Sequence, residues 1–191
     1  MRVLTSLLLA VPVALGLGVG AASANPPTPA PQMIEDFTMQ PETRWRFFTD
    51  GVMGGISTGE LLMITGDGPP HARMTGHVST ANRGGFIQMR HDLNAPPPAG
   101  TQGLRLIVRG NNQRYFAHLR TKGTLLPWQY YQAPFEVTES WQEVQLPFSA
   151  FKPSGRMLRA VPDPHALTSV AVVAYGRDHE AEVEVREVGF Y

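Results

Sequence analysis

The chain has 191 residues, with 16 basic and 16 acidic side chains and no cysteine. The absence of cysteine excludes disulfide bonds, metal–thiolate sites and cysteine catalysis. The chain is formally neutral, and its only lysines are Lys122 and Lys152. It therefore lacks the clustered basic charge of a nucleic-acid-binding domain, and we expect no nucleic acid among its partners.

The first 24 residues have the pattern of a secretory signal peptide. Arg2 gives a positive start, an apolar run covers residues 3–19, and Ala22-Ser23-Ala24 supplies the small residues that signal peptidase needs. The alternative is an uncleaved membrane anchor, because the run approaches the roughly 20 residues that span a bilayer. Pro12 and several glycines weaken the run. We therefore expect cleavage after Ala24, export to the periplasm or cell envelope, and no transmembrane segment in the mature chain.

A proline-rich segment, NPPTPAPQM, follows at residues 25–33. Its four prolines favour an extended spacer without helix or sheet. The remaining residues, 34–191, have the length of one domain that buries a substantial core. The sequence thus predicts a signal peptide (1–24), a linker (25–33) and a single domain (34–191).

Past residue 33, short segments of alternating apolar and polar residues recur between glycine, proline and asparagine residues. This period of two is typical of half-buried strands, and long helical periodicity is absent. In chain order, the predicted strands are RWRFF (44–48), ELLMIT (60–65), ARMTGHVS (72–79), GGFIQMRHDL (84–93), GLRLIVRG (103–110), RYFAHLRT (114–121), YYQAPFEV (130–137), WQEVQLPF (141–148), LTSVAVVAY (167–175) and AEVEVREVGFY (181–191). In the last segment the alternation shifts by one residue, which predicts a β-bulge near Arg186 and Glu187. So many short strands predict an all-β fold, an antiparallel β-sandwich of jelly-roll type.

The glycine-rich segment DGVMGGISTG (50–59) has three possible interpretations. Its GISTG portion matches the G-x-S-x-G motif, which would make Ser57 a nucleophile, but that motif needs a strand-to-helix turn and here a predicted strand follows. A Walker-type phosphate-binding loop would need a lysine followed by Ser or Thr, and no lysine precedes Lys122. A dinucleotide-binding loop would need a βαβ unit, and none surrounds this segment. We therefore interpret the segment as a tight connection between strands. The expected turn residues are Gly51, Gly54 and Gly55. Gly84 and Gly85 in NRGG predict a second turn of the same kind.

Several ordered blocks resemble the complex I intermediate-associated protein 30 family. They are Trp45 with DGVMGG, Ser57 and Gly59; GHVS (76–79); NRGGF (82–86); VRG (108–110); Arg114-Tyr115; YQAPF (131–135); and Trp141 with Val144, LPF (146–148) and Phe151. Together they cover about residues 34–191. The resemblance implies a galactose-binding-domain-like jelly roll, no established catalysis, and a role in respiratory complex I assembly through binding of other assembly proteins. Asn111 and Asn112 depart from it, because relatives usually show an acidic residue and glycine there.

Candidate binding residues fall into two groups. Asp50, Met53, Ser57, Asn82 and Arg109 lie in the matched blocks, and they would frame a shallow site if the two glycine turns meet at one end of the sandwich. The alternative is that Asp50 and Asn82 cap turns while Met53 fills the core. The second group holds the aromatic residues Tyr115, Trp128, Tyr130 and Tyr131. They are candidates for stacking on a sugar ring, with ordinary packing as the alternative.

The sequence favours a non-enzymatic, exported interaction module with a protein partner in the cell envelope, and a membrane complex is one candidate. An exported copy would meet only the outer loops of the membrane arm of complex I, so the assembly role stays open. The alternatives are a periplasmic carbohydrate-binding module and, less favoured, a serine hydrolase acting through Ser57. The six histidines lack metal-ligand spacing, so we expect no cofactor and no located metal. The fold leaves room for a structural calcium ion.

Overall fold

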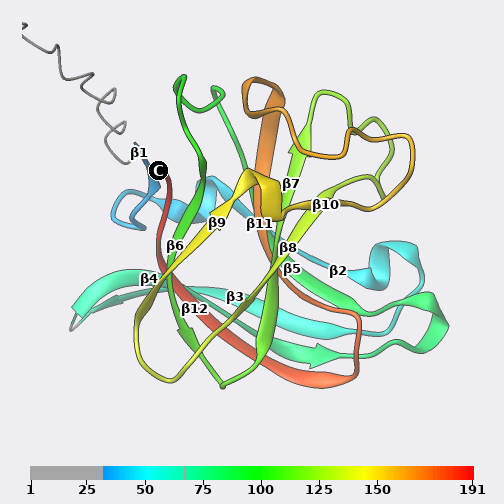
Figure 1. Cartoon of the computed structure of the whole chain (residues 1–191). Helices are drawn as coiled ribbons and strands as arrows, with labels where there is room; N and C mark the ends of the chain where they lie inside the picture. The colour runs from blue at the N-terminus through cyan, green and yellow to red at the C-terminus, as the bar shows by residue number, and fades with distance from the viewer. Residues whose placement is uncertain (1–31, 67) are drawn as a thin grey trace, which may run out of the picture.

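The computed structural model describes residues 32–66 and 68–191. The expected signal peptide and most of the expected linker lie outside these residues. Within them the chain forms two six-stranded sheets, in which all pairs are antiparallel, joined by loops and 3-10 turns without an α-helix (Figure 1). The predicted all-β sandwich is confirmed.

The two sheets divide the strands as follows. Sheet A has the order β3-β4-β12-β6-β9, with β1 also paired to β12: β1 (Gln32–Glu35), β3 (Thr58–Gly66), β4 (Gly68–Val78), β6 (Gly103–Gly110), β9 (Gln142–Pro147) and β12 (His179–Phe190). Sheet B has the order β10-β8-β7-β11-β5-β2: β2 (Trp45–Thr49), β5 (Phe86–Asp92), β7 (Arg114–Thr121), β8 (Tyr131–Glu136), β10 (Lys152–Pro153) and β11 (Leu167–Tyr175). Five 3-10 helices lie in the connections: η1 (Pro41–Thr43), η2 (Asp50–Met53), η3 (Ala81–Arg83), η4 (Phe148–Ala150) and η5 (Pro164–Ala166).

All ten predicted strands are present, and two short ones were missed. Strand β1 starts at Gln32, two residues before the expected domain boundary, and pairs with the end of β12. Glu35 at its end is buried and accepts hydrogen bonds from Arg44 and from Trp45 Nε1, which ties the strand to sheet B. The other missed strand, β10, has only two residues.

The core lies between the sheets and follows the alternation in the sequence. Leu104, Leu106 and Val108 of β6 and Val183 and Val185 of β12 point inward and are buried. The register between β12 and β6 shifts between Val185 and Glu187, which confirms the predicted bulge and returns Val188 and Phe190 to the core. Burying one such side chain contributes about 1.5–3 kcal/mol.

Candidate functional site

The two glycine turns meet at one end of the sandwich through the side chain of Asp50. Its Oδ1 accepts the Ser57 backbone N–H at 2.9 Å, and its Oδ2 accepts the Ser57 hydroxyl at 2.5 Å and the Gly85 N–H at 2.5 Å. The Ser57 oxygen in turn accepts the N–H of Ser79 at 3.0 Å. We call Asp50, Ser57, Ser79 and Gly85 the Asp50 hub. The carboxylate is fully buried and faces its own loops, so the alternative that Asp50 supports a turn holds and the binding hypothesis for it is wrong.

The glycines around the hub make room for the carboxylate. A Cβ on Gly55 would lie 2.2 Å from Asp50 Cγ, and a Cβ on Gly84 would lie 2.3 Å from Asp50 Oδ2. Gly54 instead has a left-handed φ of 87°, where its N–H closes the η2 turn. The glycine pair is therefore explained by close approach at Gly55 and by backbone conformation at Gly54.

Hydrogen bonding sets the charge of this carboxylate. Burial alone would raise the pKa of Asp50, but the bonds from Ser57, Gly85 and Phe86 outweigh it and lower the pKa below its ordinary value. Asp50 is thus an ionised, buried structural group.

The hydroxyl group of Ser57 is engaged in hydrogen bonds within the hub. This residue is buried, and its hydroxyl is hydrogen-bonded to Asp50 and to Ser79. A serine nucleophile needs an accessible oxygen and a base oriented toward it. Strand β3 follows directly, as expected, so the strand-to-helix geometry of a nucleophile elbow does not occur here.

The tip of the same loop exposes apolar side chains. Val52, Met53 and Ile56 are 73%, 58% and 54% exposed, although the backbone on either side of them is bound to the hub. The expectation that Met53 fills the core is therefore wrong, because η2 turns its side chain outward. We call Val52, Met53 and Ile56 the apolar loop.

Asn82 and Arg109 do not share a site with Asp50. Asn82 is exposed in η3 with a left-handed φ of 55°, a conformation that asparagine tolerates. Arg109 lies on β6 in sheet A, where it pairs with Glu184 at 2.6 Å and stacks 4.7 Å above the Trp141 ring. None of the contacts described for Arg109 joins it to either glycine turn.

The outer face of sheet A is an ion-pair network. In register across the strands, Glu184 of β12 lies between Arg73 of β4 and Arg109 of β6. Arg73 pairs with Glu182 at 2.6 Å, and Arg105 pairs with both Glu143 and Glu187. We call these seven charged residues the ionic face. Its arginines and glutamates are paired with one another.

The outer face of sheet B is different, because aromatic side chains gather there. His118 stacks on Tyr130, with ring centroids 4.1 Å apart and an interplanar angle of 8°. Tyr175 packs edge-on against both His118 and Phe116. We call Phe116, His118, Tyr130 and Tyr175 the aromatic face. On the neighbouring strand β11, the small residues Ala171 and Val173 oppose His118 and Phe116 in register.

Polar atoms are buried at the aromatic face without well-aligned hydrogen bonds. Within the described residues, His118 Nε2 and Gln132 Oε1 are buried and make no well-aligned hydrogen bond, but the two residues face each other in the β7–β8 register and their side chains interact. Burial lowers the pKa of His118 to about 3, with a partial opposing contribution from Gln132, so the ring is neutral at physiological pH. The stacked aromatic rings make this outer face of sheet B a candidate for ligand binding.

Trp128 lies in the loop that leads from β7 to Tyr130 of the aromatic face. Arg120 holds the start of the loop by donating to the carbonyls of Thr124 and Leu126. Ser154 holds its end, because its hydroxyl donates to the Trp128 carbonyl at 2.9 Å and accepts the Tyr130 N–H at 3.0 Å. Trp128 nevertheless remains 64% exposed. Its indole ring is thus a large, exposed surface on a well-anchored backbone.

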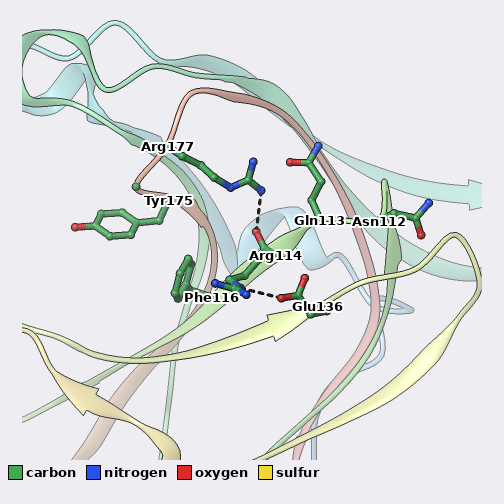
Figure 2. Close-up of a pocket in the computed structure, with 8 residues that line it drawn as sticks. Asn112, Gln113, Arg114, Phe116, Glu136, Tyr175 and Arg177 are labelled. Atoms are coloured by element: carbon green, nitrogen blue, oxygen red, sulfur yellow. Dashed lines mark hydrogen bonds and ion pairs between the residues drawn. The ribbon is translucent and has the colours of Figure 1, made fainter.

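A pocket of about 540 Å³ adjoins the aromatic face where β7 begins and β11 ends. This volume is within the range of small-ligand sites, roughly 300–1,000 Å³. In Figure 2, Phe116 and Tyr175 lie on one side, Asn112 and Gln113 on the other, and Arg177 above Arg114. The pocket thus combines aromatic surface with amide and guanidinium donors.

Sequence reasoning found part of this surface. Trp128 and Tyr130 lie there, but Tyr115 and Tyr131 are buried in the core. Tyr115 donates its hydroxyl proton to Asn111 Oδ1 and accepts the Glu182 N–H, so it ties the sheets together and is not a sugar-stacking residue. Tyr175, Phe116 and His118 were missed. Strand alternation could have placed Phe116 and His118 opposite Tyr115, on the outward side of β7.

The described residues contain no group of three His, Cys, Asp or Glu side chains arranged to hold a metal ion. Among the same residues, no helix has the length and apolar character needed to cross a bilayer.

The two antiparallel sheets define an all-β sandwich. Residues 35–181 match the family model for Complex I intermediate-associated protein 30 (CIA30), and the chain belongs to that family. No curated protein sequence gives a significant match.

Solved structures show the same fold at low identity. The family 11 carbohydrate-binding module of cellulase Lic26A-Cel5E from Clostridium thermocellum is 12% identical, with a TM-score of 0.68 over 84% of this chain and 94% of that module. The same kind of module in complex with a β-1,3-1,4-mixed-linked tetrasaccharide gives 12% identity and 0.67 over the same shares. A family 30 module of cellulase Cel9D-Cel44B from the same organism is 14% identical, with 0.51 over 70% of this chain and 82% of that one. At these identities the likeness is one of fold.

Proposed function

We propose that this chain is a non-catalytic binding module that recognises a glycan through the aromatic face, Trp128 and the adjoining pocket. The observation that carries the proposal is the exposed indole of Trp128 on a loop anchored by Arg120 and Ser154, two residues before Tyr130, whose ring stacks on His118. The likeness to carbohydrate-binding modules, one of them bound to a tetrasaccharide, supports it.

The chemistry of sugars fits this surface. A pyranose ring has an apolar C–H face that packs on an aromatic ring, and hydroxyl groups at its edge that need hydrogen-bond partners. Tyrosine and tryptophan offer large rigid surfaces with a polar group at one end. Anchoring the loop in advance reduces the ordering cost that binding would otherwise incur.

Glycan arrays followed by calorimetry on the strongest sugars test this function. We expect binding by the wild type and a loss of at least about tenfold in Trp128→Ala, equivalent to 1.4 kcal/mol. Val52→Ala, an exposed apolar substitution on the apolar loop, serves as the matched control and should bind normally. Flat responses to all glycans would contradict the proposal.

A protein partner is the second candidate, favoured by the apolar loop. Val52, Met53 and Ile56 form an exposed cluster whose flanking backbone is fixed by the hub, and exposed apolar clusters mark interaction sites. Capture from an envelope fraction with wild type and with Val52→Ser/Met53→Ser/Ile56→Ser tests it, with Trp128→Ala as the control. A protein retained by wild type and Trp128→Ala but lost in the triple variant is expected. Equal retention by all three would exclude the loop.

The proposal includes export to the cell envelope and the absence of catalysis. Fractionation with an antibody against the domain tests export, and a cytoplasmic signal at full length would contradict it. A fluorophosphonate probe tests the remaining enzymatic alternative. Labelling that disappears in Ser57→Ala would establish a reactive serine, which the hydrogen bonds of Ser57 disfavour.

A further inference from the structure

The two outer faces differ in their balance of charge. On the strands of sheet B, the outward-facing charged residues are the basic Arg46, Arg90, Arg114, Arg120 and Lys152 and the acidic Asp92 and Glu136. One row in register across all six strands reads Arg46, Arg90, Ala171, His118, Gln132 and Lys152, with three cationic residues and no carboxylate. The corresponding row of sheet A alternates as Arg73, Glu184 and Arg109. Because the chain is formally neutral, the positive charge on sheet B is a local feature.

Two guanidinium groups share the single carboxylate of Asp92. Arg46 and Arg90 both pair with this single carboxylate, and Arg90 Nε lies 3.3 Å from its Oδ1. Burial lowers the pKa of Arg120, and the nearby positive charge of Arg90 lowers it further. Like charges held this close create a positive potential that attracts anions to the aromatic face.

The pocket contains an available guanidinium. Arg177 is exposed, and among the described residues the one hydrogen bond of its side chain is a long contact, 3.5 Å from its Nη2 to the Arg114 carbonyl. Arg114 pairs with Glu136 at 2.8 Å, but both side chains are 61% exposed, and exposed pairs contribute little and exchange readily. An arginine has five N–H donors in a planar fork that suits carboxylate and sulfate oxygens. Arg177 therefore has donors free beside the rings of Phe116 and Tyr175.

We propose that the ligand of the aromatic face is an acidic glycan, whose carboxylate or sulfate group is bound by Arg177 and Arg114 while a sugar ring packs on the aromatic side chains. This inference rests on the proposed glycan-binding function and names the ligand class. The anionic group would meet the guanidinium groups at the pocket, and the positive charge across β2, β5 and β7 would favour the rest of an extended acidic chain.

The test compares glycans that differ only in charge. Binding of the mature chain to polygalacturonate is measured by calorimetry against the same polymer with its carboxylates methyl-esterified. Sulfated carrageenan and desulfated carrageenan form the second pair, which separates carboxylate from sulfate recognition. We expect at least about tenfold tighter binding to the charged member of one pair, and weakening as sodium chloride rises from about 50 to 200 mM.

Variants connect the preference to the pocket. Arg177→Gln should weaken binding to the charged glycan at least tenfold, and Arg73→Gln on the ionic face, the matched control, should leave it within twofold. Equal, salt-independent binding to charged and neutral members would overturn this inference and leave glycan binding standing. No binding to any glycan, mixed-linkage β-glucan included, would overturn the proposed function and this inference with it. Equal losses in the two variants would show general charge attraction and remove the pocket from the proposal.

Discussion

The Asp50 hub and the aromatic face both bury polar side chains, but they treat them in opposite ways. In the hub, the Asp50 carboxylate and the Ser57 hydroxyl are hydrogen-bonded to the loops that surround them. On the aromatic face, His118 Nε2 and Gln132 Oε1 are buried without a well-aligned hydrogen bond from the described residues. A satisfied buried network stabilises one loop arrangement, whereas buried groups without well-aligned bonds contribute less to stability. The difference supports a structural role for the hub and is consistent with the recognition role that we propose for the aromatic face.

The largest expected effect comes from removing the hub carboxylate. Asp50→Ala leaves the N–H groups of Ser57 and Gly85 buried without an acceptor, and each such loss costs about 1–3 kcal/mol. We expect the free energy of unfolding to fall by about 3 kcal/mol or more in urea titrations. Asp163→Ala, which removes a half-exposed cap of η5, is the control and should cost about 1 kcal/mol. A loss below 1 kcal/mol for Asp50→Ala would break the comparison.

Lowering the pH should reduce the stability contributed by the aromatic face before it reduces the stability contributed by the Asp50 hub. The pKa of His118 in the folded chain is about 3, below its ordinary 6.5. Between these two pH values the imidazole binds a proton in the unfolded chain but not in the folded chain. Its contribution to stability is complete above pH 6.5 and is lost as pH falls toward 3. The pKa of Asp50 is lowered from 3.8, so its contribution is lost only below about pH 4.

His118→Phe measures this difference, because it keeps a ring beneath Tyr130 and removes the titrating group. Between about pH 6 and 4.5 the slope of the unfolding free energy against pH should be smaller in the variant by up to about 1.4 kcal/mol per pH unit, which corresponds to one proton. His91 and His179, whose pKa values burial also lowers, remain in the variant and keep part of the slope. An unchanged slope would show that His118 is protonated in the folded chain.

Gly54→Val tests the backbone of the hub. At a φ of 87° a β-branched residue is strained, and we expect a destabilisation of about 1–3 kcal/mol. Gly155→Val is the matched control, because that glycine also has open space around its Cβ position but no left-handed φ. If both variants have the same denaturation midpoint, conformational strain at Gly54 is not what fixes the loop.

The fold was readable from the sequence because it depends on local patterns. Alternation located ten strands, and a break in it located the bulge at Val185–Glu187. Strand β10 was missed because two residues are too few to show an alternating pattern.

The candidate site was less predictable than the fold. The motif made Asp50 and Ser57 conspicuous, yet it marks a structural network, and the partners of Asp50 lie up to 36 residues away. Tyr175 and His118 meet only because β11 and β7 are neighbours, which alternation within one strand does not reveal.

The smallest expected change in stability accompanies a large change in binding. Trp128 is 64% exposed, so Trp128→Ala removes little buried surface and should alter the unfolding free energy by less than about 0.5 kcal/mol. The backbone of the loop should persist, because Arg120 and Ser154 bind main-chain groups that the substitution keeps. A thermal melt like that of the wild type, together with lost glycan binding, would show that recognition and stability reside in different parts of the molecule. A large fall in stability would instead make Trp128 a packing residue, and its exposed ring would no longer support a binding surface.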